Sequence, residues 1–152
     1  MRLFVTSIAL VALLLALAAP AVAQSPLRLP GLDSGELSEG ELEKGTQIIV
    51  FWTSWAPRGR DVVERVNRLV DRWGDQARVL TINFQEDESA VRSFLAGKPA
   101  LKAKVFLDLD GDLSKKHHVN SAPWLLILKD GRTSFSEKLP RDTDALVAQV
   151  LG

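Results

Sequence analysis

The chain has 152 residues, with 19 basic and 19 acidic side chains and a formal net charge of zero. Such a balance argues against a surface built to bind nucleic acid. The sequence contains no cysteine, so no disulfide can form and the stability of the chain must come from packing.

Residues 3–19 form an apolar run after a minimal basic start, and small residues crowd the end of that run. The triplet at 21–23, Ala-Val-Ala, fits the small-x-small rule for signal-peptide cleavage. We therefore expect residues 1–23 to be a cleaved signal peptide and the mature chain to be periplasmic. An uncleaved inner-membrane anchor and free secretion remain alternatives.

The chain after the signal peptide, about 130 residues, is long enough for one domain and too short for two. It keeps 18 basic and 19 acidic side chains, because Arg2 is the only charge removed. Residues 24–35 are rich in Pro, Gly and Leu, so we expect an extended linker without regular structure before a domain at 36–152. Ser38 and Glu41 then form a capping box for a short helix that Gly45 ends.

A strand, a helix and a second strand follow in the middle of the chain. Residues 48–52 are β-branched and aromatic, which is typical of a strand covered on both faces. From Val62 to Trp73, apolar residues recur at steps of three and four, the period of a helix that packs on a sheet. Residues 78–84 alternate as the second strand, and this order predicts a parallel crossover.

Turn signals divide the second half of the chain into shorter elements. In order, we expect a helix over 87–97, a strand over 104–108, a turn at 110–111, a helix over 113–118, a strand after 123, a hairpin turn at 129–132, a strand over 133–139 and a final helix. In the final helix, Leu146, Val147 and Val150 are expected to pack inward.

The stretch Trp55-Ala56-Pro57-Arg58-Gly59 joins the first long strand to its helix. It resembles the active-site corner of thioredoxin-like proteins, which carry Trp-Cys-x-x-Cys at this junction, so the two cysteine positions are Ala56 and Gly59.

A second block, residues 119–132, strengthens the resemblance. Pro123 matches the cis proline of the family, and a strand and a charged hairpin turn with Gly follow it. Together the two blocks are similar to TlpA-type periplasmic thiol-disulfide oxidoreductases over about residues 36–150. The resemblance implies an α/β, thioredoxin-like fold with a central mixed β-sheet flanked by helices.

The chemistry of the resembled family is thiolate attack on a disulfide. Ala56 and Gly59 cannot perform it, and no other cysteine can replace them. Val50 stands where the family places a buried proton carrier, which agrees with the loss of the whole catalytic set. We therefore expect no catalytic residue and no cofactor, although the fold alone would place the chain among oxidoreductases.

The resemblance also implies a binding site. The family holds extended polypeptide beside the cis proline, where the backbone of the preceding residue pairs with the client. Ala122 and Pro123 retain this backbone, and Trp55, Pro57 and Trp124 would flank it as anchors for a protein or peptide partner. We expect Trp55 at the surface, whereas a core position remains the alternative for Trp124. Trp52 is expected in the core.

Two further candidate sites are a pair of arginines and a pair of histidines. Arg58 and Arg60 flank a helix start and could hold an anion, or they could simply be solvated beside a carboxylate. His117 and His118 are adjacent, so on a helix they diverge by about 100° and form no metal site.

The sequence therefore predicts a redox-inactive thioredoxin-like domain that binds a protein or peptide through its cis-proline corner. The alternatives are an accessory docking subunit of envelope thiol-disulfide or cytochrome-maturation machinery, and an enzyme with a non-thiol mechanism. We expect no nucleic-acid partner, and membrane contact only through an uncleaved signal segment.

Overall fold

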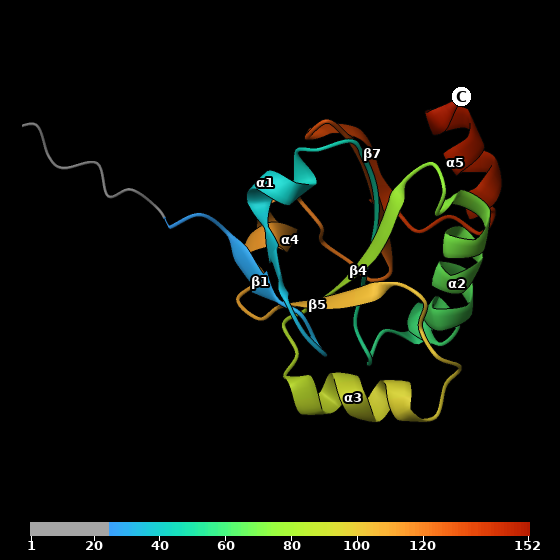
Figure 1. The fold of residues 1–152 in the computed structure, drawn as a ribbon. Helices are drawn as coiled ribbons and strands as arrows, with labels where there is room; N and C mark the ends of the chain where they lie inside the picture. Colours follow the sequence, from blue (N-terminus) through green and yellow to red (C-terminus); the bar gives the residue numbers. More distant parts are fainter. Residues whose placement is uncertain (1–24) are drawn as a thin grey trace, which may run out of the picture.

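A computed structural model describes residues 25–152, and the expected signal peptide at 1–23 lies outside the described residues. A 5-stranded mixed sheet with the order β5-β4-β3-β6-β7 forms the centre of the molecule (Figure 1). Its strands are β3 (Thr46–Trp52), β4 (Arg78–Phe84), β5 (Lys104–Asp108), β6 (Trp124–Lys129) and β7 (Arg132–Lys138). The strands β3, β4 and β5 run parallel, and β6 and β7 are antiparallel to their neighbours.

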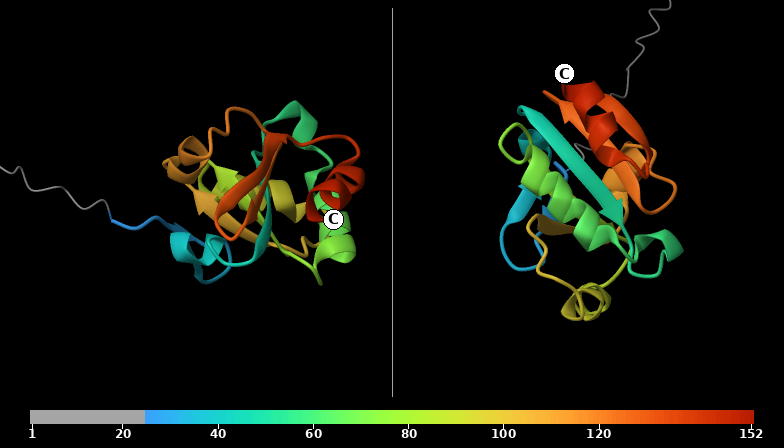
Figure 2. Two further views of the ribbon diagram at one scale, coloured as in Figure 1. Left: turned by 90° about the horizontal axis from the view of Figure 1, so that it is seen from above. Right: turned by 90° about the vertical axis from the view of Figure 1, so that its right-hand side faces the viewer.

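Helices cover the sheet on both faces. They are α1 (Glu39–Leu42), α2 (Val62–Trp73), α3 (Glu88–Ala96), α4 (Asp112–Lys116) and α5 (Thr143–Leu151), with a short 3-10 turn η1 (Pro57–Gly59). One core group lies between the sheet and α2, α3 and α5; the other lies beneath α1, α4 and an N-terminal hairpin. Figure 2 (right) views the molecule from the side covered by α2 and α5.

The strand β3 is the most buried element because it has a neighbour on each side and a layer on each face. Ile48, Val50 and Trp52 point into the core group beneath α2, and Ile49 and Phe51 point into the opposite group. This alternation is the two-residue period of a strand, so a continuous apolar run serves both faces. The predicted two-faced strand and the amphipathic helix from 62 to 73 are confirmed.

The prediction that 24–35 lacks regular structure is wrong for the described part of that range. Arg28–Pro30 forms β1, which pairs antiparallel with β2 (Glu36–Ser38). Leu29 and Leu32 are buried, and the Leu32 amide donates to the Val105 carbonyl at 2.9 Å. The segment is held by the burial of these leucines against the core. The sequence did not indicate this, because a three-residue strand that ends in proline is too short to show the two-residue period of a strand.

The capping box is confirmed by the contacts of the Glu41 carboxylate, which accepts from the Ser38 amide at 2.9 Å and from the Ser38 hydroxyl at 3.1 Å. The helix α1 ends at Leu42, somewhat before the predicted stop. Gly45 has a φ of 66°, the left-handed conformation that favours glycine, and leads the chain into β3. Among residues 25–152, no helix is long and apolar enough to cross a membrane.

Candidate functional site

The junction of β3 and α2 turns through η1 rather than passing directly from strand to helix. After Trp52 the chain reaches Ala56, and η1 spans Pro57–Gly59 before α2 begins at Val62. The Gly59 amide donates to the Ala56 carbonyl at 2.9 Å. Ala56 and Gly59, the two positions that correspond to the family cysteines, are both buried. No reactive group therefore stands at the centre of the junction.

The segment from Ser121 to Trp124 meets this junction because β6 is antiparallel to β3. The register pairs Phe51 with Trp124, which brings Pro123 to the end of β3 where η1 follows. The Ala122–Pro123 peptide bond is cis. The Pro123 carbonyl accepts from the Leu139 amide at 3.0 Å, so the last residues of β7 lie beside the same segment.

The backbone of Ala122 is unpaired. Across residues 25–152, neither its amide nor its carbonyl makes a hydrogen bond with the protein. Its neighbour Pro123 is paired through its carbonyl and has no N–H. An amide and a carbonyl on one residue at the end of a sheet can pair with an incoming strand.

The three tryptophans near the junction lie in different environments. Trp52 is 1% exposed and packs on Phe94 of α3 with ring centroids 5.2 Å apart, as the sequence predicts. Trp55 is 70% exposed, as predicted for a surface residue. An indole this exposed is available for contact with a partner.

Trp124 is half-buried and points to the other face of the sheet. It packs against the core group that contains Phe51, and its indole N–H donates to the Ser136 hydroxyl at 3.0 Å. Its exposed part lines a separate hollow beside His117 and His118. The structure therefore places Trp124 away from the groove next to Ala122, because strand alternation sends its side chain through the sheet.

A groove of about 390 Å³ runs between the start of α2 and the end of β7. Ser121, Ala122, Pro123 and Leu139 form its uncharged wall. The Ser121 hydroxyl has no hydrogen-bond partner among the residues that the structure describes. We call these four residues together with Trp55 and Pro57 the corner.

The other five residues that line the groove are charged, and we call the four cations among them the cationic wall. Arg58 and Asp61 come from the segment around η1, Arg65 from α2, Lys138 from β7 and Arg141 from the loop before α5. The sequence indicated Arg58 but not Arg65, Lys138 and Arg141, which come from separate elements. Lys138 could have been found from the predicted hairpin, because β6 and β7 pair so that Lys138 lies opposite Trp124, next to Pro123.

The structure does not bring Arg58 and Arg60 together. Arg58 lines the groove, whereas the Arg60 carbonyl accepts from Lys98 next to α3, on another side of the turn. A 3-10 turn advances about 120° per residue, so residues two apart point in different directions. The predicted pair therefore supplies one cation to the groove instead of two.

Arg65 is held in a fixed position by the loop between β7 and α5. Its Nη2 atom donates to the Pro140 carbonyl and to the Thr143 hydroxyl, the latter at 3.3 Å. Burial lowers the pKa of Arg65 from its usual value, and the charge of Asp61 offsets part of that shift. An arginine fixed on one side still has N–H donors to present on the other.

Glu86, which no sequence pattern indicated, fixes the loop that carries Trp55. Its carboxylate accepts from the Ser54 amide at 2.7 Å, from the Ser54 hydroxyl and from the Asn83 side chain at 2.6 Å. The loop after β4 is thus tied to the loop after β3. This contact orients the chain immediately before Trp55.

No group of three or more side chains that could hold a metal ion occurs in the part of the chain that the structure describes. His117 is partly buried at the end of α4, and its pKa is lowered by burial and then by the charges of Lys116 and His118. His118 adopts a φ of 55°, so the two histidines leave the helix in different directions.

No protein-family model matches the sequence, and a search of curated proteins also finds no match. Solved structures do match. An exposed lipoprotein thioredoxin of Streptococcus pneumoniae superposes with a TM-score of 0.71 at 19% identity, over 83% of this chain and 98% of that chain.

Two further solved structures give the same result. A putative thiol:disulfide interchange protein, DsbE, of Chlorobium tepidum has a TM-score of 0.71 at 21% identity, over 84% of this chain and 94% of that chain. A secreted disulfide oxidoreductase of Mycobacterium tuberculosis has a TM-score of 0.68 at 19% identity, over 82% of this chain and 94% of that chain. The chain therefore has the thioredoxin-like fold.

Proposed function

We propose that this protein is a redox-inactive thioredoxin-like domain of the bacterial cell envelope that binds an extended segment of a partner protein at the corner. The observation that carries the proposal is the unpaired backbone of Ala122. Its backbone amide and carbonyl are unpaired within residues 25–152, Ala122 lines the groove, and Trp55 is exposed in the loop that leads into η1. A partner strand could pair with Ala122 and place a side chain against the indole.

Redox inactivity follows from elementary chemistry. Thiol-disulfide exchange requires a thiolate that attacks a sulfur atom, and the chain has no cysteine. Ala56 and Gly59 occupy the positions where the resembled family carries its sulfurs. The binding surface of the fold needs only backbone and apolar groups, so it can persist without the sulfurs.

A place in the envelope is supported from two directions. The apolar run at 3–19 and the small residues after it have the pattern of an export signal. One structurally similar protein is an exposed lipoprotein and another is secreted.

The experiment is an affinity capture from bacterial envelope extract with the mature protein as bait. The variant combines Trp55→Ala with Ala122→Gln, which removes the indole and obstructs the groove without changing the charge. A matched control, Leu109→Ala, removes the other large exposed apolar side chain of the described chain. The proposal expects a partner that the wild type and the control retain and the variant loses. A partner that all three proteins retain would place docking on another face and overturn the proposal.

The identity of the captured protein also tests a second candidate function. Structurally similar proteins are thiol-disulfide proteins, so this domain could be an accessory subunit that docks on such a protein. A partner with a Cys-x-x-Cys active site, held only when the corner is intact, would favour this candidate. A partner without cysteines would favour a binding role outside redox chemistry.

A further inference from the structure

The groove beside Ala122 concentrates positive charge in a chain that is neutral as a whole. Four cationic side chains line it, Arg58, Arg65, Lys138 and Arg141, against the single carboxylate of Asp61. The complete chain has equal numbers of basic and acidic side chains. The excess in the groove therefore reflects how the fold brings these four residues together, because no two of them are neighbours in the sequence.

No groove cation lies within ion-pair distance of a carboxylate in the described chain, although the charge of Asp61 acts on Arg65. Ion pairs elsewhere on the surface involve Arg28, Arg78, Arg92, Lys102, Lys115 and Lys116. None of the four groove cations forms such a pair among residues 25–152. Their charges are thus available to a ligand, whereas a paired cation would first have to give up its partner.

One of the four cations is held in place before any ligand arrives. Arg65 is fixed by its hydrogen bonds to Pro140 and Thr143, so little side-chain entropy is lost when its remaining N–H groups bind. Lys138 and Arg141 are exposed at the rim and can adjust to the position of a charge. A fixed arginine beside exposed cations suits a carboxylate, because arginine can bind one through two parallel hydrogen bonds.

We infer that the extended segment bound at the corner is acidic and places Asp or Glu side chains in this groove. The inference rests on the function proposed above. A strand paired with Ala122 presents every second side chain to the same side, so acidic residues at alternate positions would face the cationic wall. Positive and negative surfaces that meet in this way select the partner and speed its association.

The test is fluorescence anisotropy with three labelled peptides and the mature protein at low and moderate ionic strength. The first peptide alternates Glu with Val or Thr, the second has Gln at every Glu position, and the third has Lys there. The wild type is expected to bind the Glu peptide at least about tenfold more tightly than the Gln peptide. Added salt should weaken the binding of the Glu peptide more than the binding of the Gln peptide.

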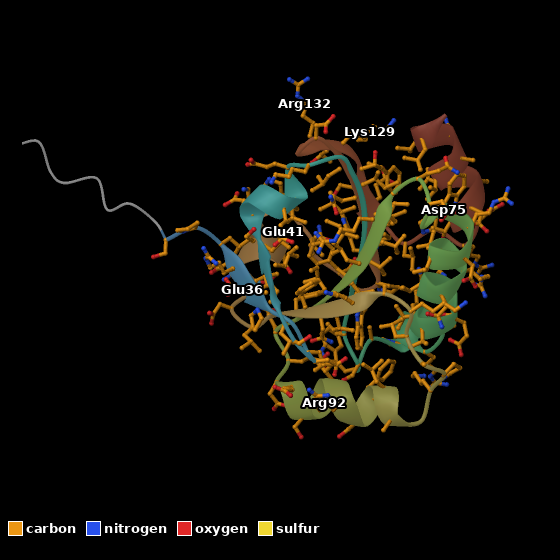
Figure 3. The ribbon with its side chains drawn as sticks, viewed as in Figure 1. Glu36, Glu41, Asp75, Arg92, Lys129 and Arg132 are labelled. Atoms are coloured by element: carbon orange, nitrogen blue, oxygen red, sulfur yellow. The ribbon has the colours of Figure 1, made fainter. Side chains whose placement is uncertain are left out.

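Two double variants of equal charge change locate the effect. Lys138→Gln with Arg141→Gln removes the rim cations, and the preference for Glu should fall to within about twofold. Lys44→Gln with Arg132→Gln removes two exposed cations from the opposite end of the sheet and should leave the preference intact. Figure 3 shows Arg132 at the end of the molecule away from α3. If both variants lose the preference equally, net charge and not the groove is responsible, and the inference fails.

The remaining outcomes separate this inference from the proposed function. Equal binding of the Glu and Gln peptides, lost when Trp55→Ala and Ala122→Gln are combined, would overturn the acidic preference and leave peptide binding at the corner intact. Tighter binding of the Lys peptide would also overturn the preference. A DNA oligonucleotide that binds more tightly than the Glu peptide would show a general polyanion surface instead. Failure of every peptide to bind would contradict both proposals.

Discussion

A Cβ atom placed on Gly59 would lie 3.7 Å from the Cβ atom of Ala56. In disulfides the two Cβ atoms are about 3.5–4.5 Å apart. The turn between β3 and α2 therefore keeps the spacing of a disulfide although neither residue carries sulfur.

The first prediction is that Ala56→Cys combined with Gly59→Cys restores an intramolecular disulfide. The added Cβ at position 59 would lie 3.2 Å from the Thr53 carbonyl oxygen, so a small local shift is expected. Mass spectrometry after mild oxidation should show a monomer that has lost two hydrogen atoms. Each single variant serves as a control and should keep one free thiol. A folded double variant that retains two free thiols would contradict the spacing.

The second prediction concerns the wild-type protein. Reduction of insulin disulfides in the presence of a small thiol should proceed at the uncatalysed rate, because the chain offers no sulfur to carry the exchange. A cysteine-containing thioredoxin provides the positive control. Catalysis that rises in proportion to the concentration of the purified wild type would contradict redox inactivity.

The third prediction concerns Asp108, whose buried carboxylate holds the start of α4. It accepts from the Ser114 amide at 2.8 Å, from the Ser114 hydroxyl at 2.7 Å and from the Leu113 amide at 3.3 Å. Asp108→Ala leaves these donors unsatisfied, which should lower the free energy of unfolding by about 2–3 kcal/mol. Urea unfolding measures the loss.

The control for Asp108 is Asp112→Ala on the same helix. Asp112 is exposed, and its contact with Lys115 is long at 3.9 Å. Its replacement should change the unfolding free energy by less than about 0.5 kcal/mol. Equal losses for the two variants would show that the buried carboxylate has no special role.

The fourth prediction is a pH effect from His117, whose pKa is lowered in the folded state mainly by burial. In the unfolded chain His117 binds a proton near pH 6.5, its ordinary pKa. In the folded chain it binds the proton only at a lower pH. Stability from this residue is therefore present above pH 6.5 and is lost as the pH falls below it. His117→Gln should lose less stability than the wild type between pH 7.5 and pH 5.5. Equal losses would contradict the prediction.

The sequence predicted best those elements whose pattern is strong and local. The strand at 48–52, the helix from Val62 and the strand at 78–84 are confirmed. Each is buried on both faces or along one side of a helix, and such burial requires apolar residues in a pattern that the sequence shows. β1 had no such period. It is held by the burial of Leu29 and by pairing with a segment that follows a turn, and neither is visible in three residues.

The site was predictable only where it follows the chain. Trp55, Ala56 and Gly59 lie in one contiguous stretch, and Pro123 lies in a second. The cationic wall could not be predicted in the same way, because its members come from η1, α2, β7 and the loop before α5. The divergence of Arg58 and Arg60, in contrast, could have been predicted, because residues two apart on a helical turn do not face each other.

The most direct test of the central claim is an NMR titration of the ¹⁵N-labelled mature protein with the Glu and Gln peptides. If a partner strand pairs with the corner, the Ala122 amide and the Trp55 indole N–H should shift saturably, and the Ala122 amide should become protected from hydrogen exchange. The Arg132 amide, at the opposite end of the sheet, should not move. Binding that leaves Ala122 and Trp55 unchanged while it shifts another surface would contradict the claim that this corner is the binding site.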